Sequence, residues 1–113
     1  MCGLVGIINR EFVIKGSQPL LDYFKQALYC DTLRGKHGTG VLGVDKSGNP
    51  AIYKRALPAS DFLELSLTNK IISDSTNIFL VGHNRWATRG THTSENSHPF
   101  SHDNIHLFHN GTI

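Results

Sequence analysis

The chain has 113 residues, of which 39% are hydrophobic and 18% charged, and its net charge is +2. This length fits one domain whose core needs neither disulfide nor metal, and nothing in the spread of Lys and Arg indicates a nucleic-acid partner. The apolar runs are too short to span a membrane, and "MCGLVGII" lacks the pattern of a secretory leader. We therefore expect a cytoplasmic protein with free thiols at Cys2 and Cys30.

The first half of the chain predicts a strand, a helix and a hairpin. The β-branched run 3–9 is typical of a buried strand. A helix is expected over 17–35 with Ser17 as its N-terminal cap. The hairpin is expected over 40–56, around the turn sequence "DKSGNP". The apolar stripe of the helix comprises Leu20, Leu21, Phe24, Ala27 and Leu28.

The second half predicts a shorter helix over 59–67 capped by Ser60, then a strand over 77–87. The stretch 88–104 has the Gly, Ser, Asn and Pro content of a long loop. A last strand over 105–113 turns at its Asn-Gly pair. The order β-α-β-β-α-β-loop-β predicts an α/β (α+β) fold, in which helices pack on an antiparallel sheet.

Cys2 is the first candidate for a functional residue. If Met1 is removed, Cys2 carries both a thiol and a free α-amine, and the amine can accept the proton of the thiol. One residue would then supply a nucleophile together with its base. The alternative is a buried structural cysteine, which is the commoner role of a cysteine near a chain end.

The stretch "GHNRWATRG" is a second candidate, for binding an anion. The guanidinium of Arg85 suits a carboxylate in bidentate geometry. Thr88 and the backbone N–H groups around Arg89 and Gly90 can donate to the same anion. The alternative is a solvated Arg85 next to Trp86 in the core.

Two further stretches bear on the same site. The side-chain amide of Asn110 and the N–H of Gly111 can converge as an oxyanion hole, although Asn-Gly is also an ordinary turn. The glycine-rich "RGKHGTG" follows a helix and precedes a strand, which is the reverse of a phosphate-binding loop. We expect it to form a tight connection that brings Arg34 near the site.

Five histidines lie in the last quarter of the chain, at His92, His98, His102, His106 and His109. Their spacing fits no zinc pattern, and only Glu95 and Asp103 lie among them as carboxylates. We therefore expect no metal and no other cofactor.

The motifs "MCGLVGI", "RGKHGTG", "GHNRWATRG", "NSHPF" and "HNGTI" occur in this order along the whole chain. Together they resemble the glutaminase domain of the class II glutamine amidotransferases, which are N-terminal-nucleophile hydrolases. "RWAT" and "HNG" are most similar to the glucosamine-6-phosphate synthase (glutamine–fructose-6-phosphate aminotransferase) branch. The resemblance implies an α/β/β/α sandwich with antiparallel sheets, of which residues 1–113 form the N-terminal portion.

The resemblance also implies a reaction. Cys2 resembles the family's nucleophile, which attacks the side-chain amide of L-glutamine and gives a γ-glutamyl thioester, ammonia and then glutamate. Asn110 and Gly111 match the oxyanion pair. The ammonia would pass to a synthase domain or to a partner chain.

The remaining implied residues surround the substrate. Arg85 matches the residue that holds the α-carboxylate, with Thr88 as its hydroxyl helper and Trp86 lining the pocket. Arg34 matches a structural arginine close to the nucleophile, and His98 matches a histidine in the loop after the arginine motif. The substrate-binding set is Arg34, Arg85, Trp86, Thr88, Arg89 and His98.

The chain departs from the family pattern in three ways. Lys36-His37 stands where the family commonly has an Asp, and Arg89 stands at a His position, which is tolerable if only the backbone N–H donates. The family's domain is also longer, and its next part carries an Asp that binds the substrate's α-amine.

Two other functions therefore stay open beside a glutaminase. One is an N-terminal-nucleophile amidase that acts on a different amide. The other is a truncated or degenerate fragment that acts as a binding or regulatory module. Such a fragment would expose an open sheet edge, through which two copies of the chain could form a homodimer.

Overall fold

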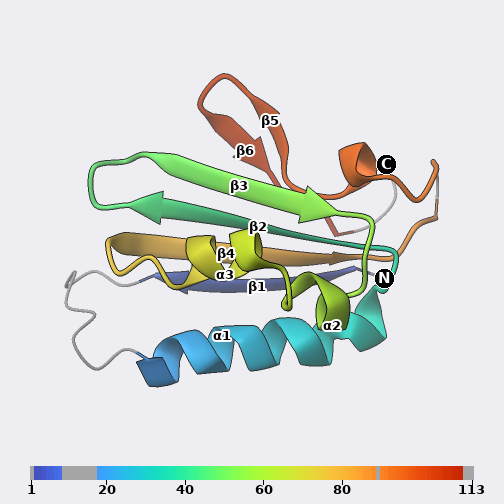
Figure 1. The fold of residues 1–113 in the computed structure, drawn as a ribbon. Coiled ribbons are helices and arrows are strands. Elements are labelled where there is room, and N and C mark those ends of the chain that lie inside the picture. Colours follow the sequence, from blue (N-terminus) through green and yellow to red (C-terminus); the bar gives the residue numbers. More distant parts are fainter. Residues whose placement is uncertain (1, 9–17, 89, 111–113) are drawn as a thin grey trace.

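The computed structural model describes residues 2–8, 18–88 and 90–110. A four-stranded antiparallel sheet with the order β1-β4-β2-β3 forms its centre (Figure 1). The strands are β1 (Gly3–Ile8), β2 (Gly38–Asp45), β3 (Pro50–Arg55) and β4 (Asn77–Arg85). The expected α/β class with antiparallel strands is confirmed, and the hairpin expected over 40–56 is the β2–β3 pair.

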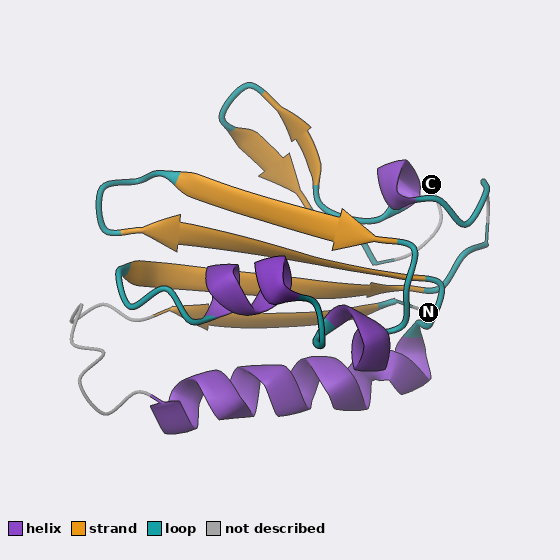
Figure 2. Cartoon of the chain, in the orientation of Figure 1, coloured by secondary structure: helices purple, strands orange, loops and turns teal. Residues whose placement is uncertain are grey.

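Helices cover one face of this sheet (Figure 2). α1 (Gln18–Cys30) continues into the 3-10 helix η1 (Asp31–Arg34), while α2 (Ala59–Phe62) and α3 (Ser66–Ile72) follow β3. Within the described part of the chain, no helix is long and apolar enough to cross a membrane. The core between the helices and the sheet is formed by Leu21, Phe24, Leu28, Val41, Ala59, Phe62, Ile71, Ile72 and Leu80.

α1 is amphipathic, but its buried stripe is narrower than the sequence predicts. Leu21, Phe24 and Leu28 are buried against the sheet at the spacing of one helix face. Leu20 is 38% exposed and Ala27 is exposed too, so their assignment to the stripe was wrong. A helix that lies on a sheet buries only the residues that point straight at it.

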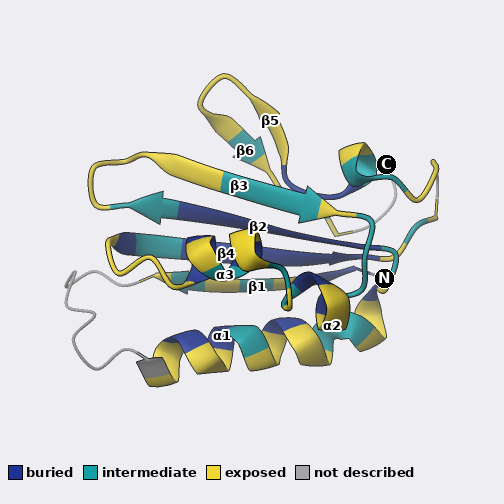
Figure 3. Cartoon of the chain, in the orientation of Figure 1, coloured by how far each residue is buried: buried dark blue, intermediate teal, exposed yellow. Residues whose placement is uncertain are grey.

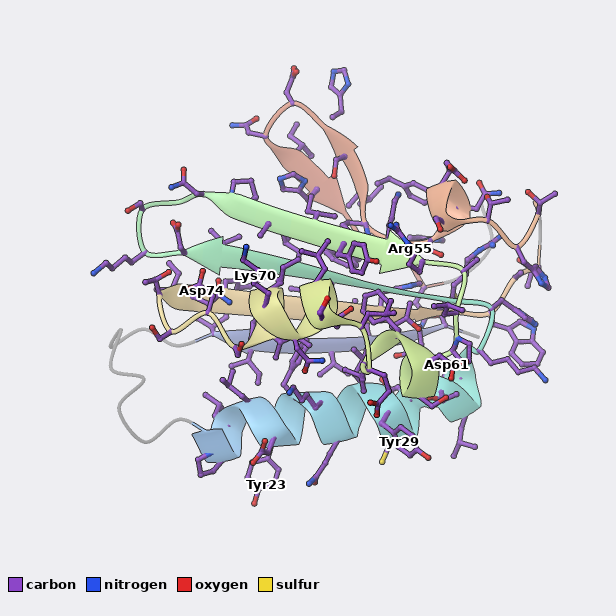
Figure 4. All side chains as sticks on the ribbon, viewed as in Figure 1. Tyr23, Tyr29, Arg55, Asp61, Lys70 and Asp74 are labelled. Atoms are coloured by element: carbon purple, nitrogen blue, oxygen red, sulfur yellow. The ribbon has the colours of Figure 1, made fainter. Side chains whose placement is uncertain are left out.

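α1 packs closely against the sheet at Gly82 of β4. A Cβ on Gly82 would lie 2.8 Å from Cδ1 of Leu28 and 3.1 Å from Cζ of Phe24. The opposite side of α1 is in solvent, where Tyr23 and Tyr29 point away from the sheet (Figure 4). Gly82, which has no side chain, therefore sets the distance between α1 and the sheet.

The single helix expected over 59–67 is two helices. Pro58, with an extended ψ of 157°, precedes α2, and Ser60 lies inside the helix, so Ser60 is not the cap. The chain turns again at Leu65, which is extended, before α3 begins. This break lets both Phe62 and Ile72 reach the core. Ser17, the other expected cap, lies outside the described residues.

The stretch expected to be a loop over 88–104 contains regular structure. It includes the 3-10 helix η2 (Ser94–Asn96) and β5 (Phe100–His102), which pairs with β6 (Ile105–Leu107) as a two-stranded antiparallel sheet. The strand expected over 105–113 therefore ends early, at Leu107. Strands of three residues are too short to show a periodic pattern in the sequence.

The segment 97–109 lies on the face of the sheet opposite the helices. Asn84 donates a hydrogen bond to the backbone of α1, so its neighbour His83 faces the other way, toward this segment. The backbone of His98 approaches β2 so closely that a Cβ on Gly40 would collide with its carbonyl oxygen. The central strands β2 and β4 are consequently the most deeply buried (Figure 3).

Candidate active site

Cys2 lies beside the end of β4 because of the register of the sheet. β1 and β4 run antiparallel with Gly3 opposite Asn84, so the residue before Gly3 lies next to those that follow Asn84. Cys2 is 7% exposed, and hydrogen bonds join it to three segments that are distant in the sequence. These bonds fix the position of Cys2.

The sulfur of Cys2 is held by the backbone of Trp86. The N–H of Trp86 donates to Sγ at 3.3 Å, and the carbonyl oxygen of Trp86 lies 3.9 Å from the same sulfur. These two contacts fix the position of Sγ at the end of β4. Trp86 as a whole residue is 40% exposed.

The backbone of Cys2 has two side-chain partners. Nε of Arg34 donates to its carbonyl oxygen at 3.1 Å, so η1 brings Arg34 to the position that the sequence predicts. The backbone nitrogen of Cys2 donates to Oδ1 of Asn110, also at 3.1 Å. Asn110 therefore turns its oxygen toward Cys2, and its NH₂ group is the half of the amide that can donate elsewhere. Gly111, its expected partner, lies outside the described residues.

His37 holds the peptide that faces the sulfur. Its Nδ1 accepts a hydrogen bond from the N–H of Ala87 at 2.8 Å. Its ring stacks on His92 with 4.2 Å between ring centroids, and tilts against Trp86 with centroids 4.9 Å apart. Burial and the neighbouring His92 lower the pKa of His37, which favours the neutral ring that this bond requires.

The arginine of the second motif is buried. Arg85 is 6% exposed, and its Nη1 donates to the carbonyl oxygen of Thr91 at 2.8 Å. The loop after β4 turns back at Gly90, whose φ is +78°, and so brings Thr91 onto the guanidinium. Thr88 is exposed on the same loop, and Arg89 lies outside the described residues.

His98 is buried in a cluster of aromatic rings. Its ring stacks on His83 with centroids 3.9 Å apart and tilts against Phe100 with centroids 4.6 Å apart. Its Nδ1 accepts the N–H of His109 at 3.0 Å. Burial, followed by the charges of His83 and His109, lowers the pKa of His98 to about 4.

The remaining histidines do not converge. His92 belongs to the stack with His37, and Nδ1 of His106 bonds to Ser101 in the β5–β6 sheet. His102 lies beside Asp103, and both side chains are in solvent. Across the described ranges, no group of three or more His, Cys, Asp or Glu side chains is placed to hold a metal ion.

The sequence interpretation missed two residues that the structure brings to the site. His37 bonds to the peptide after Trp86, although the sequence shows it only as a departure from the family pattern. His83 lies below the segment that carries Asn110, and its Nε2 bonds to the carbonyl oxygen of His109 at 3.0 Å. Its position two residues before Arg85 on one strand was the available signal, because such residues share a face.

Comparison with known proteins extends the motif analysis to the whole chain. No family model matches it. It is 34% identical over 113 residues to the glutamine–fructose-6-phosphate aminotransferase of Caulobacter vibrioides, and 35% identical over 113 residues to that of Bradyrhizobium diazoefficiens. The resemblance predicted from the motifs is confirmed. All of the chain is matched, and it spans 17% of the length of each of these two aminotransferases. An aminotransferase of the same name from Sulfurisphaera tokodaii is 31% identical over 115 residues.

Proposed function

We propose that residues 1–113 are the N-terminal portion of a glutaminase domain, and that Cys2 is its nucleophile. One observation carries this proposal: the N–H of Trp86 points at the sulfur of Cys2 while Asn110 bonds to its backbone nitrogen. Three motifs that are far apart in the sequence thereby meet at one cysteine. The aminotransferases that the chain resembles use glutamine, as their names state, and this supports the choice of substrate.

The proposed reaction begins with removal of Met1, which frees the α-amine of Cys2. The amine takes the proton of the thiol, and Sγ forms a bond to the side-chain amide carbon of glutamine. Negative charge moves to the amide oxygen, where the NH₂ of Asn110 and the N–H of Gly111 stabilise it. The C–N bond then breaks as the ammonium group of Cys2 returns the proton to the leaving nitrogen, giving ammonia and a thioester. Water attacks the thioester and releases glutamate.

The α-carboxylate of glutamine is proposed to bind beside the end of β4. The planar guanidinium of Arg85, at the end of β4, suits a carboxylate in bidentate geometry, which supports this placement. Thr88 and the backbone N–H of Arg89 would add donors, and the ring of Trp86 would cover the substrate's methylene groups. Arg34 would keep Cys2 in place through its carbonyl oxygen.

The ammonia is proposed to pass to a synthase domain or a partner chain. The relatives' names couple glutamine to fructose 6-phosphate, which supports a synthase as the receiver. Two copies of the chain are proposed to pair through the edge strand β1, where Leu4 and Ile8 are 52% and 68% exposed. A cytoplasmic location stays a prediction.

Ammonia release tests the reaction and separates it from the other two functions. The protein is incubated with glutamine, asparagine and a γ-glutamyl anilide, and ammonia or aniline is measured. The proposal predicts turnover of glutamine and its loss in Cys2→Ala, while Cys30→Ala, which changes an exposed thiol outside the site, keeps the rate. A preference for another amide would indicate a different amidase. No turnover, with glutamine still bound, would indicate a binding module.

A further inference from the structure

A stacked pair of buried histidines lies under the segment that carries Asn110. His83 comes from β4 and is fully buried, while His98 precedes β5 and is 7% exposed. Their ring centroids are 3.9 Å apart and their planes differ by 1°. Neither ring is among the atoms that contact Cys2, so the reaction described above gives this pair no role.

The two rings form hydrogen bonds with both the N–H and the C=O of His109. Nε2 of His83 donates to the carbonyl oxygen of His109 at 3.0 Å, and the N–H of His109 donates to Nδ1 of His98 at 3.0 Å. The first bond requires a proton on Nε2 of His83, and the second requires that Nδ1 of His98 has none. Nδ1 of His83 is buried without a hydrogen-bond partner among the described residues, so a proton there would be costly.

The backbone around His98 is itself fixed by contacts with β2 and β3. Gly40 of β2 leaves room for the carbonyl oxygen of His98 to lie against the sheet. Nζ of Lys54 donates to the carbonyl oxygens of Ser97 and Pro99, both at 2.9 Å, and so fixes the backbone on each side of His98. The two rings therefore have little freedom to move with the segment above them.

We propose that His83 and His98 are positioning residues, which orient Asn110 by fixing the backbone of His109 immediately before it. Asn110 in turn reaches the backbone nitrogen of Cys2 at 3.1 Å. On this proposal the pair acts through this backbone, so His98 supports the site without binding the substrate directly, in contrast to the role that the family resemblance implies. The inference rests on the proposed function, in which Asn110 stabilises the oxyanion.

The arrangement works only while His98 is neutral. The charged and titratable groups that face His98 are His83, His109, Lys54 and Arg85, and the ring of Phe100 also lies against it. Burial and these charges lower the pKa of His98 to about 4. A lowered pKa keeps Nδ1 free of a proton at neutral pH, so the bond from His109 is intact there and is lost in acid.

Paired substitutions separate positioning from simple loss of packing. His98→Asn keeps an acceptor near the place of Nδ1, whereas His98→Leu removes it; His83→Gln keeps a donor near Nε2, whereas His83→Leu removes it. At neutral pH we expect kcat for glutamine to fall about 10²-fold in both Leu variants, because a displacement of 1 Å costs about that much. KM should change little, and the Asn and Gln variants should recover most of the loss. Equal losses in all four variants would overturn the inference.

An NMR titration tests the inference without any activity. In the unmodified protein, the amide signals of His109 and Asn110 should move together with the ring signals of His98 as the pH falls toward 4. In the double variant His83→Gln with His98→Asn, which keeps both hydrogen-bonding groups but removes both rings, the same amide signals should move much less over this pH range. If the amide signals of His109 and Asn110 do not change while His98 titrates, the inference is overturned, whether or not the protein hydrolyses glutamine. Absent turnover with coupled signals would instead refute the proposed function alone.

Discussion

At the scale of single residues, Asn110 has the clearest testable role. Its Oδ1 accepts the backbone N–H of Cys2 at 3.1 Å, which directs its NH₂ group elsewhere. Removal of one oxyanion donor typically lowers kcat by about 10²–10³-fold. We therefore expect this loss in Asn110→Ala, measured as glutamine hydrolysis, with a small change in KM. Asn104→Ala, in the exposed turn between β5 and β6, is the control and should not change kcat.

His37 gives a second prediction at this scale. Its Nδ1 holds the N–H of Ala87, next to the peptide of Trp86 that faces the sulfur of Cys2. His37→Ala should loosen this peptide and lower the rate at which iodoacetamide alkylates Cys2 by several-fold. His37→Asn, which keeps an acceptor near Nδ1, should restore most of that rate. Peptide mapping gives the rate at each thiol, and an unchanged rate at Cys2 in His37→Ala would refute this role.

At the scale of helices and strands, the packing of α1 on β4 depends on one glycine. Gly82→Ala would place a Cβ 2.8 Å from Cδ1 of Leu28, and overpacking of this kind costs about 1–3 kcal/mol. We expect the free energy of unfolding in urea to fall by that amount. Gly6→Ala on β1 is the matched control, because its nearest neighbour, the carbonyl oxygen of Leu80, would lie at an ordinary 3.9 Å. Equal effects of the two substitutions would contradict this account of the packing.

How far the sequence predicts these elements depends on their length and on where their partners lie. β2, β3 and β4 carry long apolar or alternating runs, and the structure contains all of them. The break between α2 and α3 was missed because it serves two core residues, Phe62 and Ile72, whose contacts lie elsewhere in the chain. β5 and β6 were missed as a pair because each has three residues and their register follows from pairing alone.

The residues of the candidate site also fall into two groups, those that the sequence predicts and those that it does not. Cys2, Arg34 and Asn110 could be proposed from motifs, because each supplies a chemistry that its residue type suits. His83 and His37 act through bonds to backbone groups that are 26 and 50 positions away along the chain. No local pattern indicates which peptide a buried ring will hold, so these two residues required the three-dimensional structure.

At the scale of the whole molecule, the buried histidine pair predicts how stability depends on pH. Burial lowers the pKa values of His83 and His98 to about 4, while in the unfolded chain both lie at about 6.5. Between these values the unfolded chain binds more protons than the folded one. The free energy of unfolding should therefore fall as the pH drops from about 6.5 to about 4.

Urea titrations at a series of pH values measure this dependence. The double variant His83→Gln with His98→Asn keeps both hydrogen-bonding groups without the titration, so its stability should vary less with pH over the same window. If the free energy of unfolding of the unmodified protein is constant from pH 6.5 to 4, the prediction is wrong. The two rings would then titrate alike in the folded and unfolded states.

The central claim, that Cys2 is an N-terminal nucleophile for glutamine, is tested most directly by mass spectrometry. The protein is treated with a glutamine-analogue electrophile, and the intact mass and the modified peptide are determined. The account predicts a chain without Met1 that carries one adduct on the buried Cys2, and no adduct on the exposed Cys30. General alkylating reagents prefer exposed thiols, so this selectivity requires recognition of the glutamine-like part. Retained Met1, or labelling confined to Cys30, would contradict the claim.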